Sequence, residues 1–150
     1  MIPIIRIGFK DYAIDGMSAF NAAMSYNMIN GINKVKDGCV IDYSKVLISR
    51  GSLCPSPVIN ATVTEDLLQF EWDPILNENA KSTDQVMVLA HNAAKGESVF
   101  DINAGKRRNA STYLNMPSHW KSDVIETYLA FKNESGTLVS DSCYTGQLVL

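Results

Sequence analysis

The clearest alternation of apolar and polar residues lies in the last third of the chain. Within residues 124–132, every second position carries a residue suited to a buried face, the period of two that strands show: Ile125, Thr127, Leu129 and Phe131. Residues 133–136 supply a turn, in which Gly136 can take a positive φ. Residues 143–150 follow as a second strand pattern. Together these stretches predict an antiparallel hairpin.

A different period follows the first dozen residues. Apolar side chains recur there at intervals of three and four, which predicts an amphipathic helix: Ala13, Met17, Phe20, Met24, Met28 and Ile32. Asp15 or Ser18 can cap its start, and residues 30–31 fit its end. The opposite face carries Asn21 and Ser25 and is nearly uncharged. Two interpretations stay open: a helix half covered by its own domain, or a polar face that contacts another protein.

The segments that flank this helix are short. Residues 2–12 are apolar and contain Pro3, so they predict an extended segment or a fragment of helix. Residues 34–38 predict a polar turn. Residues 39–49 are rich in β-branched side chains and predict one strand, or two short strands broken near Asp42.

Two prolines then mark a boundary. Pro55 and Pro57 exclude a central strand and predict a connection or an edge segment, because proline has no amide hydrogen to donate. We therefore expect residues 1–52 to form a helical lead-in with one or two strands, and residues 53–150 to form a β-sandwich domain.

Short strand patterns recur beyond these prolines, each ended by Gly, Pro, Asn or Asp: residues 67–72, 85–91, 97–102 and 110–116. In the first of them, Leu68, Phe70 and Trp72 are expected to face inward. The second is apolar almost throughout, so both of its faces are expected to be covered. The sequence thus predicts a mainly β fold: an antiparallel sandwich of six or seven strands preceded by an amphipathic helix.

Three stretches resemble the fibronectin type III variety of immunoglobulin-like sandwich. LQFEWDP places Trp72 at the end of the second strand, ETYLAFKNESG matches the penultimate strand with its turn, and LVSDS matches the run into the last strand. The resemblance covers the chain from Pro57 onward. It implies a large aromatic core and contacts made through loops and strand edges.

Most of the chain also resembles a family of uncharacterised Bacteroidetes proteins known only as a domain of unknown function. The matching stretches are IGFKDYA, MSAFNAAMSYNMINGI, IDYSKVLISRG, FEWD, AKSTDQVMVL, MPSHW, VIETYLAF and VSDS. This family implies no activity, substrate or catalytic residue. Its members carry a further Gly/Lys-rich segment ahead of IGFK, so we expect this chain to be a shortened form.

Composition limits the classes of function. The 150 residues are 46% hydrophobic and 19% charged, enough for one domain with a core. The net charge of −3 gives no general attraction to nucleic acid or anionic membrane. No apolar run approaches the ~18 residues that a membrane span needs. The first residues lack a signal-peptide pattern, so the default expectation is a cytoplasmic protein.

The three cysteines are Cys39, Cys54 and Cys143, with no CxxC pair among them. They are not a disulfide framework, so buried free thiols are favoured over a single bridge between the first two. The two histidines, His91 and His119, share no HxH or HExxH pattern, and we expect neither a metal site nor a cofactor.

Two clusters are candidates for binding. Arg107 and Arg108 follow Gly105, but the earlier glycine and following helix of a phosphate loop are missing, so an exposed hairpin turn is favoured. Trp120, with Tyr113 and Tyr144, is a candidate for an exposed aromatic platform that binds sugars. The alternative is that Trp120 caps the open end of the sandwich core.

These observations favour a non-enzymatic structural or protein–protein interaction module that binds a protein partner or copies of itself. By analogy of fold, a phage-derived or surface-assembly role suits such a module. A carbohydrate-binding module that uses aromatics near Trp120 is the main alternative, and an unrecognised hydrolase is the third. The predicted interaction surface consists of Asn21, Ser25, Trp120, Tyr113, Arg107 and Arg108.

Overall fold

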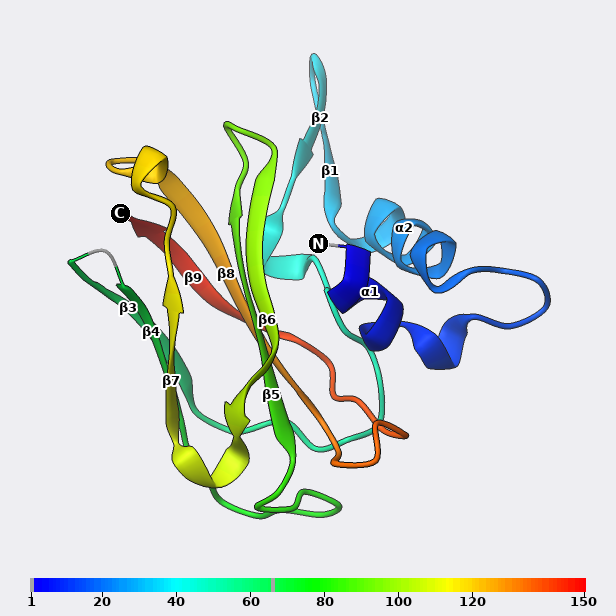
Figure 1. The fold of residues 1–150 in the computed structure, drawn as a ribbon. Coiled ribbons are helices and arrows are strands. Elements are labelled where there is room, and N and C mark those ends of the chain that lie inside the picture. Colours follow the sequence, from blue (N-terminus) through cyan, green and yellow to red (C-terminus); the bar gives the residue numbers. More distant parts are fainter. Residues whose placement is uncertain (1, 66) are drawn as a thin grey trace.

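The computed structural model describes residues 2–65 and 67–150, which are arranged in three layers (Figure 1). A three-stranded sheet, a four-stranded sheet and a helical layer are stacked in that order, and a small hairpin projects beside the helices. The described residues contain nine strands, all paired in antiparallel sheets, and two α-helices. The predicted mainly β fold is therefore confirmed.

Seven of the strands form the sandwich. The three-stranded sheet has the order β3-β4-β7: β3 (Ile59–Thr64), β4 (Leu67–Trp72) and β7 (Ser111–Asn115). The four-stranded sheet has the order β6-β5-β8-β9: β5 (Gln85–Asn92), β6 (Glu97–Lys106), β8 (Val124–Lys132) and β9 (Cys143–Val149). The predicted C-terminal hairpin is the β8–β9 pair.

Within the sandwich, the strand predictions differ most from the structure at β3 and β6. β3 was not predicted, although it follows Pro57 as an edge strand of its sheet, which agrees with the expected edge segment. β6 is longer than the predicted residues 97–102, because its pairing with β5 continues to Lys106 despite a register shift beside Val86. The extent of both strands depends on pairing with another strand, which a local pattern of apolar residues does not show.

The two central strands of the larger sheet are buried on both faces. In β5, Val86 and Val88 pack into the core between the sheets, whereas Met87 and Leu89 pack under the helices. This confirms the expectation from its continuous apolar run. In β8 the alternation predicted only one covered face, yet Tyr128 is buried on the second face, because the helical layer covers it.

The helical layer begins with α1 (Ile2–Gly8), so the helix alternative for the first residues is confirmed. A 3-10 turn (Lys10–Tyr12) and a loop lead to α2 (Ala19–Asn30). Ser18 caps α2, because its Oγ accepts a hydrogen bond from the backbone N–H of Asn21 at 3.1 Å.

The face of α2 that packs inward is not the predicted one. Ala22 and Ala23 are 8% and 4% exposed and lie in a core with Phe9. The larger apolar residues on the predicted face are between 45% and 60% exposed: Met17, Phe20, Met24 and Met28. Small alanines let α2 lie close to α1, so the second apolar face of the helix is left outside.

After α2, the chain forms the hairpin of β1 (Ile32–Val35) and β2 (Gly38–Ile41). The predicted polar turn is the tip of this hairpin, and β1 was missed. The strand pattern predicted over residues 39–49 holds only for β2, since a 3-10 turn (Tyr43–Lys45) follows it and residues 46–49 form no second strand. None of the helices in residues 2–65 and 67–150 is long and apolar enough to span a membrane.

Residues 48–51 join the helical layer to the sandwich. The N–H of Arg50 donates to the Gly8 carbonyl at 2.8 Å. On the other side, Ser49 Oγ donates to the Ser140 carbonyl at 2.7 Å, and the N–H of Ile48 donates to Ser142 Oγ at 3.0 Å. Three of the stretches that carry the second resemblance, IGFKDYA, IDYSKVLISRG and VSDS, therefore meet at one place.

Replacing Gly8 by alanine is expected to lower the free energy of unfolding by about 1–3 kcal/mol, through overpacking. The added Cβ would collide with the Ile48 carbonyl oxygen and lie 2.7 Å from Ser49 Cα. Gly105→Ala is the matched control, because its Cβ would meet nothing closer than 3.6 Å. Urea unfolding of both variants checks this, and equal stabilities would contradict it.

Candidate functional site

Exposed apolar side chains are concentrated in one stretch of the chain. Among the described residues, nine of the seventeen exposed large hydrophobic side chains fall within residues 14–41: Ile14, Met17, Phe20, Met24, Met28, Ile29, Val35, Val40 and Ile41. Single exposed apolar residues need no explanation, but a contiguous group of them marks a binding surface. This region is therefore the candidate functional site.

Part of this group lies along α2. Phe20, Met24 and Met28 recur at intervals of four along α2, the spacing of one helix face, and we call them the helix face. The helix Ala19–Asn30 contains no charged residue. An exposed helix normally carries charges on its solvent side. This helix instead exposes an uncharged, largely apolar surface to solvent.

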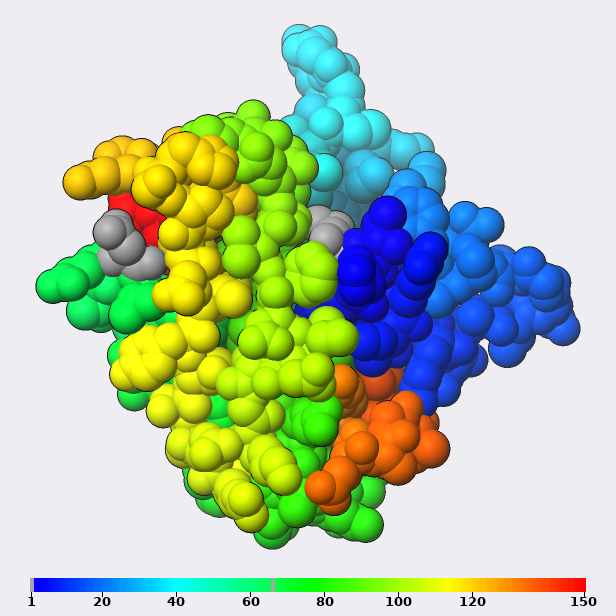
Figure 2. Space-filling model, viewed as in Figure 1, coloured from blue at the N-terminus to red at the C-terminus, as the bar shows by residue number. Residues whose placement is uncertain are grey.

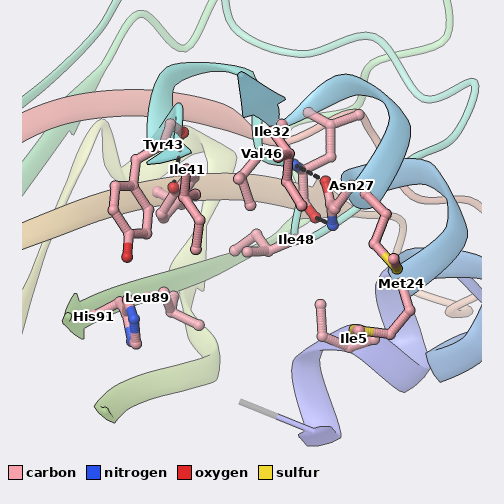
Figure 3. A pocket seen from close by; sticks show the side chains of 14 residues that line it. Ile5, Met24, Asn27, Ile32, Ile41, Tyr43, Val46, Ile48, Leu89 and His91 are labelled. Carbon is pink, nitrogen blue, oxygen red and sulfur yellow. Dashed lines mark hydrogen bonds between the residues drawn. The ribbon is translucent and has the colours of Figure 1, made fainter. Parts of the chain in front are cut away.

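A groove lies between α2, the base of the hairpin and the outer face of the four-stranded sheet (Figure 3). Its volume is about 280 Å³. The walls are mostly apolar and come from the two helices, the hairpin, the segment after it and β5: Ile5, Met24, Ile32, Ile41, Val46 and Leu89. Figure 3 shows Met24 and Ile5 at one end and Tyr43 and His91 at the other.

Asn27 links α2 to residue 47 on the opposite wall of the groove through two hydrogen bonds. Its Nδ2 donates to the Leu47 carbonyl and its Oδ1 accepts from the Leu47 N–H, both at 2.9 Å. These paired bonds fix the extended segment after the 3-10 turn against α2. Asn27 lines the groove, but its polar atoms are already used by the fold.

The tautomer of His91 follows from its contacts. Nδ1 lies 2.9 Å from the Glu97 carbonyl oxygen and 2.9 Å from Ser98 Oγ. A carbonyl only accepts, so Nδ1 carries the proton of the neutral ring and Nε2 keeps a lone pair. Burial lowers the pKa of His91 below its usual value, which favours this neutral form.

A buried carboxylate lies beside this end of the groove. Glu126, opposite His91 in the β5–β8 pairing, is 4% exposed. Its Oε2 accepts from the Tyr144 hydroxyl at 2.6 Å, and its Oε1 accepts from Gln147 Nε2 at 2.8 Å. Burial and then Glu126 raise the pKa of Tyr43, so the phenol stays neutral. The groove therefore ends in neutral hydrogen-bonding groups near a fixed negative charge.

The predicted site residues are not brought together. Asn21 and Ser25 are exposed on α2, as expected. Tyr113 is 56% exposed, but it lies on β7 in the other sheet. Trp120 is fully buried, and its Nε1 donates to Glu97 Oε2 at 2.7 Å. The prediction of an exposed platform at Trp120 is therefore wrong, and the alternative of a cap on the core is confirmed.

The two arginines also differ from the prediction. Arg108 is exposed, but Arg107 is fully buried and its Nε contacts Asp84 Oδ2 at 3.1 Å. An interaction surface that includes Arg107 is therefore wrong, because the guanidinium is part of the core. It lies 3.9 Å from the centre of the Phe131 ring and donates to the Cys54 carbonyl at 2.7 Å.

The three thiols are free, and the open alternative of a Cys39–Cys54 bridge is not realised. Cys39 is exposed on the hairpin, which corrects the expectation of burial. Sequence reasoning missed Tyr43, His91 and the methionines as site residues. The signal that could have found the methionines is the lack of charge on α2, which was noticed only for its polar face.

Comparison with known proteins gives a family but no activity. The model of a family of unknown function (DUF6266) matches residues 1–146. No curated protein matches the chain. No solved structure matches it either.

Proposed function

We propose that this chain, which belongs to the DUF6266 family of unknown function, is a non-enzymatic structural module that binds a second copy of itself. The contact surface is the helix face. The observation that carries this proposal is the exposure of three large apolar side chains along one face of a helix without charge. Burying such a surface releases water from apolar area, which is the main driving force of stable association.

The absence of charge favours a second copy over an unrelated partner. In a dimer with twofold symmetry the same patch occurs on both sides of the axis. A charged residue near that axis would face its own copy and repel it. Interface cores are also depleted of charge and enriched in methionine and aromatic residues. The helix face has two methionines and one phenylalanine, so it meets both conditions.

The hairpin extends this surface. Val35 and Val40 are each 49% exposed, and the hairpin stands out from the body of the molecule in Figure 2. A two-stranded hairpin is only marginally stable alone, and both of its outer edges carry unpaired backbone groups. Contact with a neighbouring molecule would cover these edges, which agrees with an assembly role.

We also infer that β3 to β9 form a sandwich of the fibronectin type III variety, a scaffold that presents the interaction surface. Three strands pack against four, and the connections β4–β5, β6–β7 and β7–β8 cross between the sheets, as in Greek-key sandwiches. Trp72 packs edge-to-face on Phe131 across the core, with ring centres 6.1 Å apart. A phage-derived or surface-assembly setting stays a prediction.

Sedimentation velocity at increasing concentration tests the proposal. The wild-type chain is expected to show a mass that rises from monomer to dimer. Phe20→Glu is expected to weaken association by at least about tenfold, equivalent to ~1.4 kcal/mol, because the introduced charges repel across the axis. The change should not harm folding, since Phe20 is 45% exposed and a carboxylate near a helix start is favourable.

Tyr113→Glu is the matched control, because it adds the same charge at an exposed aromatic residue on the opposite sheet. It should dimerise like the wild type. A wild-type chain that stays monomeric at every concentration would disprove self-association. Equal dimerisation of wild type and Phe20→Glu would show that the helix face is not the contact.

A further inference from the structure

We propose that the groove under α2 is a binding site for an uncharged amphiphile, a short alkyl chain that ends in a hydroxyl group. This goes beyond self-association, because Tyr43 and His91 line the groove and Phe20 does not, although Met24 and Met28 belong to both the groove and the helix face. The two properties can therefore be changed separately.

The size and lining of the groove define the apolar part of the ligand. The volume of about 280 Å³ is roughly twice the ~150 Å³ of an apolar cavity that binds benzene. An eight-carbon chain with one oxygen fits this space. Figure 3 shows the apolar side chains around the middle of the groove and Met24 at the end away from His91. The alkyl chain fits this apolar portion.

The two neutral groups at the other end define the head of the ligand. Nε2 of His91 is an acceptor, because Nδ1 carries the proton that faces the Glu97 carbonyl. The Tyr43 ring lies 5.9 Å from the imidazole ring, and its neutral hydroxyl can donate. A ligand hydroxyl both donates and accepts one hydrogen bond. It can therefore satisfy His91 and Tyr43 together.

The charge at this end excludes an anionic head. Glu126 is a buried carboxylate whose two oxygens are held by Tyr144 and Gln147. A fatty-acid carboxylate would be repelled by this negative charge.

A cationic head is also disfavoured. Both oxygens of Glu126 already accept hydrogen bonds, so an ammonium group would lose its water without gaining a direct partner of opposite charge. Asp42 is occupied by Lys45 at 2.9 Å. The balance of desolvation and hydrogen bonding leaves the neutral hydroxyl as the best match.

A titration of the 150-residue chain followed by NMR of methionine methyl groups tests the site. The probes are 1-octanol, octanoate and octylammonium. With 1-octanol, the Met24 and Met28 methyl signals should shift and saturate, whereas that of Met116, which lies in the core between the sheets, should not. Octanoate and octylammonium should bind at least about tenfold more weakly, a difference of ~1.4 kcal/mol.

Tyr43→Phe keeps the ring and removes the hydroxyl, so it should weaken 1-octanol several-fold and leave the shift pattern in place. His91→Leu should reduce the preference for 1-octanol over octanoate. His119→Gln is the matched control, because His119 is exposed and lies outside the groove, and it should change neither value.

Three results would overturn the proposal: no saturable shift of Met24 and Met28, equal affinity for 1-octanol and octanoate, or affinities unchanged by both groove variants. Phe20→Glu separates this site from self-association, since it should weaken the dimer at least about tenfold and leave 1-octanol binding intact. Loss of 1-octanol binding in Phe20→Glu would mean that the ligand occupies the dimer contact and not the groove.

Discussion

Replacing Asp84 by alanine is expected to lower the free energy of unfolding by about 3–5 kcal/mol, the range for breaking a buried ion pair. Asp84 and Arg107 are both fully buried, with Asp84 Oδ2 at 3.1 Å from Arg107 Nε. Without the carboxylate, a positive charge would remain in the core between the sheets. Urea unfolding followed by circular dichroism measures the loss.

The surroundings of this pair explain why the loss should be large. The backbone N–H of Arg107 donates to the Asp84 carbonyl at 2.7 Å, and Trp72 Nε1 donates to the Arg107 carbonyl at 2.6 Å. Asp84 Oδ2 also accepts from the Lys81 N–H at 2.8 Å. Asp84 thus fixes the loop before β5 to the end of β6 as well as neutralising the arginine.

Two controls separate burial of charge from loss of packing. Arg108→Ala removes the exposed neighbour and should change stability by less than about 0.5 kcal/mol. The double variant Asp84→Leu with Arg107→Met removes both charges, so it should be more stable than Asp84→Ala alone. If Asp84→Ala were as stable as the wild type, the buried ion pair would not be present in solution.

Trp120→Ala is expected to cost about 3–5 kcal/mol, the usual range for truncating a buried tryptophan. The side chain is 0% exposed and lies in the core between the sheets with Ile125 and Leu129. Its removal leaves a cavity and takes one hydrogen bond from Glu97 Oε2, which keeps its contact with His119 Nε2 at 2.8 Å. Since that carboxylate side chain is 50% exposed, water can solvate it, and most of the loss should come from packing.

Trp120→Phe separates the two contributions, because it keeps most of the apolar volume and removes only the indole N–H. We expect it to lose less than half of the stability lost by Trp120→Ala. Tyr113→Ala, at an exposed aromatic residue, should be near neutral. A small effect of Trp120→Ala in denaturant unfolding would mean that the side chain is exposed, and the platform for sugars would have to be considered again.

The strands could be predicted because their patterns are local. β4 has the predicted bounds, and Leu68, Phe70 and Trp72 face inward, since the period of two requires no knowledge of the partner strand. The burial of Trp120 and Arg107 could not be read in this way. Each lies in a loop or turn rich in polar residues, and only the closing of the sandwich encloses it.

The candidate site shows the same division. The uncharged character of α2 is a property of the sequence, and the exposure of Asn21 and Ser25 could be predicted from it. The groove is not, because it joins Ile5, Met24, Val46 and His91, which are far apart in the chain. Sequence reasoning examined His91 as a metal ligand and Met24 as a core residue, and it had no means to place them together.

By itself, the sequence determined the mainly β class, the position of most strands and of one capped helix, because periodicity and capping act over a few residues. The tertiary structure decided which of the two apolar faces of α2 is buried. Ala22 and Ala23 allow close packing on α1, while Met24 and Met28 do not fit there and stay outside. That choice depends on the space between layers, and it created both the exposed helix face and the groove beneath it.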